Sequence, residues 1–440
     1  MAAATEPPSP AGAPGAPPRL ERVVGLAGLT AIAVNGVVGS GIFVLPATVA
    51  LILGPASPVA YLVAALLTAL VVLCFAEAGS RTERTGGPYV YAREAFGPFV
   101  GFQVGWLFFL TRLTAAAAIA NAFVAYLGVL WPAASAGLGR AAVLAALIGS
   151  FAAANAAGIR HGAFLVNALT VAKLLPLLFF VGVGLAYADP SRYDVLTIPP
   201  LAGLREASLL LIFAFGGFEN ASVPAEEVKQ PRRNVPIALL LAIAATTVLY
   251  VLIQIVTLGT YPDLAGDPAP LASSARAFLG PAGALLLTAG AVLSTAGSIS
   301  ALSLVGPRIL YALSVGGQFP RAFGLVHPRW HTPHVSIAVF AAATLLIAIW
   351  GSFAQLAAAS VVARLIFSAV TCLAVPVLRR KQGSEPAQFV IPGGMTVPLL
   401  ATAVSLWLLS GMTEGQVMGG GIAIAVGTMA YGVARRRDRS

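Results

Sequence analysis

Long, nearly uninterrupted runs of apolar residues, separated by short polar segments, follow one another from residue 25 to residue 434. A helix needs about 20 such residues to cross the hydrocarbon core of a bilayer. The strands of a membrane β-barrel would alternate apolar and polar residues instead, and these runs do not. We therefore predict twelve transmembrane helices, over residues 25–52, 57–76, 98–131, 140–158, 163–187, 205–225, 235–259, 281–311, 333–350, 354–378, 396–412 and 416–434.

Composition supports an all-α membrane protein in a lipid bilayer. The 440 residues are 58% hydrophobic and 10% charged, with a mean hydropathy of +0.89. Soluble domains carry about 25% charged residues, so this chain lacks the polar side chains to cover a soluble surface. The composition excludes a soluble enzyme, a disordered chain and a nucleic-acid-binding domain as descriptions of the whole protein.

The basic residues indicate the topology. With the N-terminus in the cytoplasm and twelve spans, nineteen of the 26 Lys and Arg residues fall on the cytoplasmic side and four outside. The remaining three, Arg112, Lys173 and Arg364, lie inside spans. This bias follows the positive-inside rule and places both termini in the cytoplasm. The net charge of +10 is therefore mostly a signature of topology.

The two ends of the chain differ from the spans. Residues 1–18 are rich in Ala, Pro and Gly and predict a disordered tail, while residues 435–440 form a basic cytoplasmic terminus. Few lysines and many Ala, Gly and Arg residues suggest a GC-rich bacterial genome, and hence the cell membrane as location. The sequence does not determine the oligomeric state.

Two of the predicted spans contain glycine clusters that favour unwinding. Residues 35–43 (NGVVGSGIF) lie in span one and residues 213–220 (FAFGGFEN) in span six, each followed by a proline expected to restart the helix. Unwound backbone frees N–H groups that bind an anion and carbonyl groups that bind a cation, which together suit a zwitterion. The alternative is close helix packing over small residues. Spans one and six are where a five-plus-five inverted repeat places its broken helices.

Four stretches of the chain resemble a known family. They are residues 39–43 (GSGIF), residues 213–219 with 225–236 (FAFGGFE and AEEVKQPRRNVP), residues 84–93 (RTGGPYVYAR), and residues 306–308, 327–329 and 332–333. The sequence resembles the amino acid–polyamine–organocation transporters, which have a leucine-transporter-like fold. The resemblance implies a first repeat over residues 19–187, a second over 188–378, and two further spans over 379–434.

The resemblance also implies a substrate site. The backbone around Ser40, Gly41 and Ile42 would hold the α-carboxylate of an amino acid, and the carbonyls of Val37, Phe213 and Gly216 would hold its α-ammonium. Ala214 lies in the same stretch. Phe213 is similar to the aromatic lid of the family, and Glu219 matches a position near the gate.

Charged residues inside a membrane are costly and usually functional. We predict that Arg112 in span three pairs with Glu219 beside the site, which would explain how both charges are tolerated. The alternative is that Arg112 binds the side-chain carboxylate of an acidic substrate. Arg364 in span ten is interpreted as an interfacial or snorkelling residue and is assigned no role.

Lys173 in span five is the candidate coupling residue. In proton-coupled members of the family, a span-five lysine takes the place of the sodium ion that sodium-dependent relatives hold between spans one and eight. A lysine removed from water releases its proton more readily, so it can couple proton movement to transport. The alternative is a fixed charge that tethers span one to span eight. Ser294, Thr295 and Ser298 in span eight are expected as polar neighbours.

The expected function is secondary active transport of an amino acid, with a proton as the coupling ion. Phe108, Phe109, Phe213 and Phe218 suggest an apolar pocket, so a neutral amino acid is the expected substrate, with Phe108 also a gating candidate. Cationic amino acids and polyamines are the runners-up, and exchange or uniport remains open. An integral membrane enzyme or a channel is disfavoured, because neither nucleotide-binding and protease motifs nor filter repeats occur. No cofactor, metal ion or nucleic acid is expected.

Overall fold

The computed structural model of the chain describes residues 21–437, apart from residues 195–198, 268, 352, 382–385 and 413. The predicted tail over residues 1–18 and the last three residues of the predicted basic terminus lie outside this range. The helices, in chain order, are α1 (Leu26–Val37), α2 (Gly41–Leu53), η1 (Gly54–Ala56), α3 (Ser57–Gly79), α4 (Pro88–Phe96), α5 (Pro98–Leu130), η2 (Pro132–Ala134), α6 (Gly137–Ala156), α7 (Ile159–Gly184), η3 (Pro190–Arg192), α8 (Leu201–Phe215), η4 (Phe218–Ser222), η5 (Ala225–Glu227), α9 (Pro231–Thr260), α10 (Pro270–Val315), η6 (Arg321–Gly324), α11 (His334–Trp350), α12 (Phe353–Arg380), α13 (Thr396–Leu409) and α14 (Glu414–Arg437).

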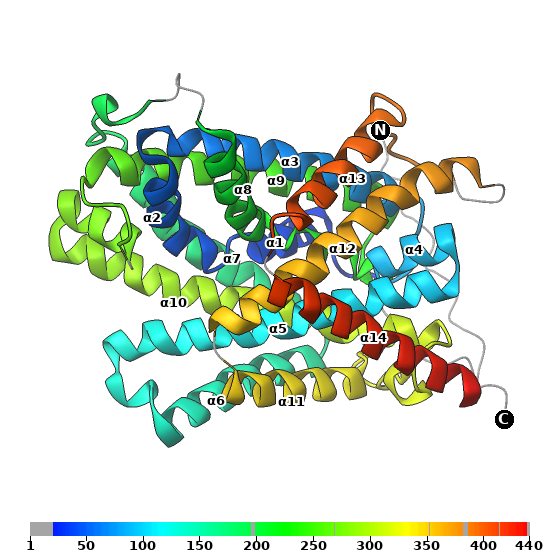
Figure 1. Cartoon of the computed structure of the whole chain (residues 1–440). Helices are drawn as coiled ribbons and strands as arrows, with labels where there is room; N and C mark the ends of the chain where they lie inside the picture. The colour runs from blue at the N-terminus through cyan, green and yellow to red at the C-terminus, as the bar shows by residue number, and fades with distance from the viewer. Residues whose placement is uncertain are drawn as a thin grey trace, which may run out of the picture.

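The described residues form a bundle of helices without a β-strand, and one parallel backbone bridge joins Val24 to Val228. Proline is the first residue of α4, α5, α9 and α10, where its missing N–H costs nothing and its fixed φ suits a helix. Most of the long helices run side by side in Figure 1, with α1 in the middle of the bundle. The largest cluster of buried apolar side chains draws on α1, α3, α5, α9 and α10.

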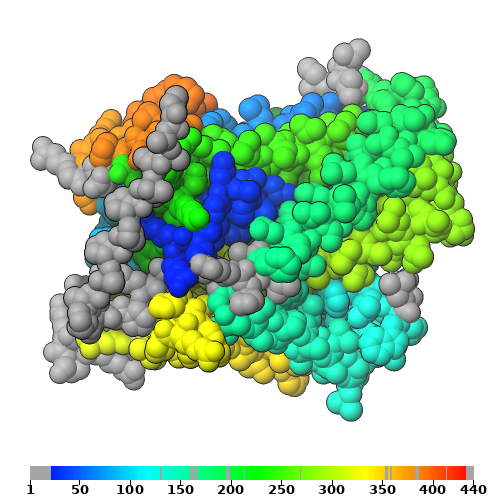
Figure 2. Space-filling model, turned by 180° about the vertical axis from the view of Figure 1, so that it is seen from behind, coloured from blue at the N-terminus to red at the C-terminus, as the bar shows by residue number. Residues whose placement is uncertain are grey.

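Span one is broken where the sequence predicts it. Helix α1 ends at Val37 and α2 begins at Gly41, so that three residues between them are not helical. On the face of the molecule shown in Figure 2, the segment that leads into α1, in dark blue, reaches the surface between green and yellow segments. The residues of the break, Val38, Gly39 and Ser40, are buried, whereas Glu21 and Arg22 before α1 are exposed.

Span six is also broken, but its second half differs from the prediction. Helix α8 ends at Phe215, and Gly217 has a left-handed backbone with φ of +116° that favours glycine. The chain continues through the short 3₁₀ turns η4 and η5, so no α-helix restarts at Pro224. A Cβ on Gly217 would lie 2.2 Å from the carbonyl oxygen of Gly36. Glycine thus lets the two breaks touch, which rules out any larger residue at this contact.

The number of membrane spans remains a prediction. By length and composition, the described residues contain seven helices suited to crossing a membrane, or eight if α13 and α14, bent by 118°, form one span. The first of the seven runs continuously over Gly41–Gly79, and the apolar helices α1 and α11 are shorter than 18 residues. The described residues therefore form helices of the kind found in membrane proteins, and the twelve membrane spans remain a prediction.

Candidate functional site

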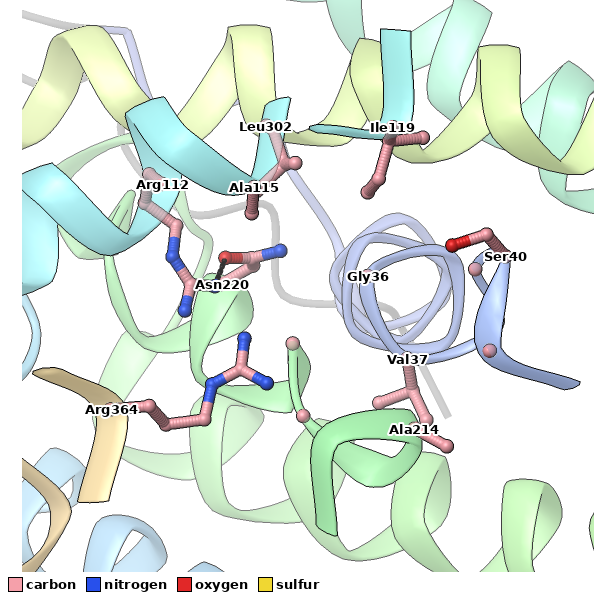
Figure 3. Close-up of a pocket in the computed structure, with 14 residues that line it drawn as sticks. Gly36, Val37, Ser40, Arg112, Ala115, Ile119, Ala214, Asn220, Leu302 and Arg364 are labelled. Carbon is pink, nitrogen blue, oxygen red and sulfur yellow. Dashed lines mark hydrogen bonds between the residues drawn. The ribbon is translucent and has the colours of Figure 1, made fainter. Parts of the chain in front are cut away.

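A narrow cavity lies where the two breaks meet. Its volume is about 40 Å³, which holds two or three water molecules. The lining combines the two breaks with side chains from α5, α10 and α12 (Figure 3): Gly36, Val37, Gly39, Ser40, Gly41, Arg112, Ala115, Ile119, Ala214, Gly216, Gly217, Asn220, Leu302 and Arg364. An amino acid needs more room than the cavity offers in this conformation.

Arg112 and Glu219 form the ion pair that the sequence predicts. The Nη2 atom of Arg112 lies 2.7 Å from Oε1 of Glu219, and the two side chains are 0% and 1% exposed. Arg112 also donates from Nη1 to Oδ1 of Asn220 at 2.7 Å. The second carboxylate oxygen of Glu219 accepts the backbone N–H of Gly217 at 2.8 Å. The pair thereby fixes the left-handed turn that ends α8.

A second arginine reaches the same carboxylate. Nε of Arg364 on α12 lies 3.1 Å from Oε1 of Glu219, and Arg364 lines the cavity with only 8% of its surface exposed (Figure 3). Our interpretation of Arg364 as an interfacial or snorkelling residue is therefore wrong. The guanidinium packs against Gly216, where a Cβ would lie 1.5 Å from Nη1 and would force the end of the Arg364 side chain to shift.

The predicted carboxylate and ammonium positions lie around this cavity. Ser40 and Gly41, at the start of α2, line it from one side, and Val37, Ala214 and Gly216 line it from the breaks. The N–H groups in the first turn of a helix have no partner within the helix and attract anions. Ile42 is buried in the core beside the cavity, and the side chain of Phe213 is not among those that the structure describes. The lid role of Phe213 thus stays a prediction.

Lys173 on α7 lies beside the end of α1 and does not line the cavity. Its ammonium is fully buried and donates to the backbone carbonyl of Asn35 at 2.9 Å, to that of Val38, and to Oγ of Ser298 at 3.4 Å. Ser294 donates to the carbonyl of Val38 at 3.2 Å. Lys173 therefore joins α7 to the end of α1 and to α10, through acceptors that carry no charge.

A family model described as amino acid permease matches residues 24–429. The chain belongs to this family of amino acid permeases. Among its relatives, the methylthioribose transporter of Bacillus subtilis is 28% identical, over 95% of this chain and 94% of its own. The branched-chain amino acid permease BcaP and the serine/threonine exchanger SteT of the same organism are 27% and 26% identical, over 89% and 95% of this chain and 88% and 98% of their own.

The permease is thus a multi-pass membrane transporter and not an enzyme. The names of these relatives cover methylthioribose, branched-chain amino acids and serine or threonine, so membership alone does not choose a substrate. The choice has to come from the side chains around the cavity. Among the described residues, no three His, Cys, Asp or Glu side chains gather as metal ligands would.

Three of the four phenylalanines that the sequence assigns to an apolar pocket, Phe108, Phe109 and Phe218, do not line this cavity. Phe108 packs on Phe367 with ring centres 4.9 Å apart and carries the guanidinium of Arg112 at 4.7 Å over its face. Phe109 packs on Phe340, and Phe218 packs on Phe75 at 5.4 Å. Because a uniformly apolar span does not reveal which face meets the site, sequence reasoning assigned these core side chains to the substrate. In this conformation Phe108 supports Arg112, and its gating role stays a prediction.

Thr295 is a further correction. Its hydroxyl donates to the carbonyls of Ala291 and Val292 within its own helix, so it does not join Ser294 and Ser298 beside Lys173. Residues 294 and 298 share a helix face, whereas residue 295 lies about 100° away around the helix.

Sequence reasoning missed Tyr250 on α9. Its hydroxyl is fully buried and donates to the carbonyl of Val37 at 2.9 Å and to that of Ala214 at 3.3 Å. It therefore bridges the two broken helices at the cavity. A tyrosine in an apolar span needs a hydrogen-bond partner for its hydroxyl, and this requirement could have marked Tyr250 in the sequence as a residue near exposed backbone carbonyls.

A larger cavity of about 460 Å³ lies at the end of α4, beside the last turns of α10. Glu226 lines it, and its carboxylate accepts the backbone N–H of Thr85 at 3.3 Å. Glu226 lies in the loop between α8 and α9, outside the apolar helices. Burial raises the pKa of the Glu226 carboxyl above its ordinary value, and the hydrogen bond from Thr85 offsets part of this effect. The charge of Glu227 raises the pKa further, and the charges of Arg22 and Arg84 lower it.

Proposed function

We propose that this permease is a secondary transporter that carries an amino acid across the cell membrane by alternating access around the cavity between the two breaks, with a proton as coupling ion. The observation that supports this most is the meeting of two unwound segments at one buried cavity. One segment offers the N–H groups at the start of α2, and the other offers carbonyls at the end of α8. These groups suit the α-carboxylate and the α-ammonium of a zwitterion.

The proposed architecture has twelve spans in a five-plus-five inverted repeat, residues 19–187 and 188–378, followed by two further spans. Breaks in the first and sixth predicted spans are what such a repeat requires. Both termini would lie in the cytoplasm, as the distribution of basic residues predicts. The second half of span six would then face the cytoplasm together with the start of α1.

Lys173 is the proposed coupling residue. When protonated, its ammonium holds the carbonyls of Asn35 and Val38 at the end of α1. Loss of the proton removes the charge and one N–H donor, which weakens this hold and frees α1 to move. A buried lysine whose acceptors are uncharged is suited to this cycle, because the neutral form is less disfavoured than in an ion pair.

Uptake into proteoliposomes tests the proposal. Purified protein would be supplied with a panel of labelled amino acids, with and without an inward proton gradient. We expect gradient-stimulated uptake that Lys173→Ala abolishes and that Lys229→Ala, in an exposed loop, retains. Uptake that needs preloaded amino acid and ignores the gradient would make the protein an exchanger, as the relative SteT is named, and would reduce Lys173 to a tether. Uptake of no amino acid would refute the proposal.

A further inference from the structure

The charged side chains that line the cavity, among the described residues, are both arginines. Arg112 and Arg364 have ion pairs with a single carboxylate, that of Glu219. The three groups together carry one surplus positive charge, and Arg112 and Glu219 are no more than 1% exposed. A zwitterionic substrate adds no net charge. The site therefore favours a substrate that brings one more negative group than positive ones.

Another cluster of two arginines and one glutamate shows how a surplus positive charge is tolerated without a ligand. Glu77 also holds two arginines, Arg81 at 3.0 Å and Arg379 with its Nε at 2.7 Å. There the side chain of Arg379 is 18% exposed, so that water shares in its solvation. The cluster at the cavity is more deeply buried, and a bound anion would take the place that water has beside Arg379.

Asn220 points to where that anion binds. Its Oδ1 accepts from Arg112, which can only donate, so the amide nitrogen Nδ2 of Asn220 must point away from Arg112. The Nδ2 atom is buried without a hydrogen-bond partner, and Figure 3 shows it directed toward Gly36 across the cavity. A buried N–H donor without a partner is costly unless a ligand accepts from it. Arg364 and Asn220 thus present donors at one end of the cavity, and Ser40 lies at the other (Figure 3).

We infer that the substrate is an amino acid with an anionic side chain: its α-carboxylate binds at the start of α2, and its side-chain carboxylate binds Arg364 and the amide of Asn220. This inference rests on the proposed function and refines it. A planar guanidinium suits a carboxylate, with which it forms paired charge-assisted hydrogen bonds. A cationic side chain would face two guanidinium groups, and a neutral one would leave the surplus positive charge uncompensated. The inference therefore replaces the neutral substrate that we expected from the phenylalanines.

Competition on the wild-type protein gives the first test. Uptake of labelled L-aspartate into proteoliposomes would be inhibited by unlabelled L-aspartate, L-glutamate, L-asparagine, L-leucine and L-lysine. Asparagine has nearly the shape of aspartate but no charge, so it isolates the effect of the carboxylate. We expect aspartate or glutamate to inhibit about 10- to 100-fold more strongly than asparagine, as for the loss of a hydrogen bond to a charged group. Transport of leucine, asparagine or lysine in preference to both acidic amino acids would overturn the inference and leave the proposed function standing. Failure of every amino acid would refute both.

Substitution of Arg364 gives the second test. Arg364→Leu is expected to lose the preference for aspartate over asparagine, and Arg364→Lys, which keeps the charge, is expected to retain part of it. Arg321→Ala, in an exposed turn, is the control for loss of an arginine. An unchanged ratio of aspartate to asparagine uptake in Arg364→Leu would overturn the assignment of the side-chain carboxylate to Arg364. If Arg364→Leu is not recovered as folded protein, Arg364→Lys and the wild-type competition decide the question.

Discussion

Glu219→Gln is expected to destabilise the protein more than Arg112→Met does. Removing one partner of a buried ion pair costs about 3–5 kcal/mol, because a charge is left in apolar surroundings. Glu219→Gln leaves two such charges, on Arg112 and Arg364, so the loss should reach or exceed that range. Arg112→Met leaves Glu219 paired with Arg364 and one neutral acceptor, Oδ1 of Asn220, unsatisfied, which costs about 1–3 kcal/mol.

The double variant adds a further expectation. Arg112→Met together with Glu219→Gln leaves one buried guanidinium instead of two, so it should be more stable than Glu219→Gln alone. The assay is heating of the detergent-solubilised variants, followed by size-exclusion chromatography to measure the fraction that stays monodisperse. The temperature at which half is lost ranks the four proteins.

Glu227 and Arg308 provide a matched control. They form a buried pair of one acid and one base, with both side chains 0% exposed. Glu227→Gln and Arg308→Met should therefore lower the midpoint by similar amounts. The reasoning is refuted if Arg112→Met is as damaging as Glu219→Gln while the control pair behaves symmetrically, because Arg364 would then not compensate Glu219.

Three further predictions concern the surroundings of the cavity. Gly216→Ala should reduce uptake, because its Cβ would lie 1.5 Å from Nη1 of Arg364 and would displace the guanidinium beside Glu219, whereas Gly182→Ala, with no atom within 4 Å of the added carbon, should transport normally. Tyr250→Phe removes the hydroxyl that bridges the two breaks, and it should lower the thermal midpoint by the equivalent of about 1 kcal/mol and reduce initial uptake rates; equal rates would show that the bridge is dispensable. Because the pKa of Glu226 is raised, the folded protein binds the proton of this carboxyl more tightly than the unfolded chain does. The ionised carboxylate therefore destabilises the fold fully at a pH above the folded pKa, and this destabilisation disappears as the pH falls toward the ordinary value of 4.5. The gain in thermal midpoint on acidification should therefore be smaller in Glu226→Gln than in the wild type, and identical pH profiles would contradict this.

The features that could be predicted from sequence are those with a large local energy. Glycine clusters inside an apolar span are costly as helix, and both breaks are present. A buried acid and a buried base must find partners, and Arg112 and Glu219 do. The position of Lys173 beside the end of α1 came from the family resemblance, because nothing in the neighbourhood of residue 173 states which helix it meets.

The features that could not be predicted depend on how each helix is rotated in the bundle. In α12 every face is largely apolar, so the sequence does not say that Arg364 points at the cavity and not at lipid. The same ambiguity led us to place Phe108 and Phe218 around the substrate, although both pack in the core. Polar residues carry more information, since Ser294 and Ser298 share a face by their spacing and Thr295 does not.

The contacts of α1 at its two ends suggest how a proton could bias the proposed alternating access. Where the chain enters α1, the N–H of Val24 donates to the carbonyl of Glu227 at 2.9 Å and the N–H of Lys229 donates to the carbonyl of Val24 at 2.9 Å. The carboxylate of Glu227 is itself held by Arg308. The two hydrogen bonds that hold Val24 join backbone groups, which carry no exchangeable charge.

At the other end of α1 the partner is Lys173, the proposed coupling residue, whose ammonium holds the carbonyls of Asn35 and Val38. A proton leaving Lys173 would therefore weaken one end of α1 and leave the other intact. The helix would then pivot about its entry segment, and because its unwound end also lines the cavity, the same movement would change the substrate site. Coupling between proton and substrate needs no separate relay in this arrangement, since both act on the three residues between α1 and α2.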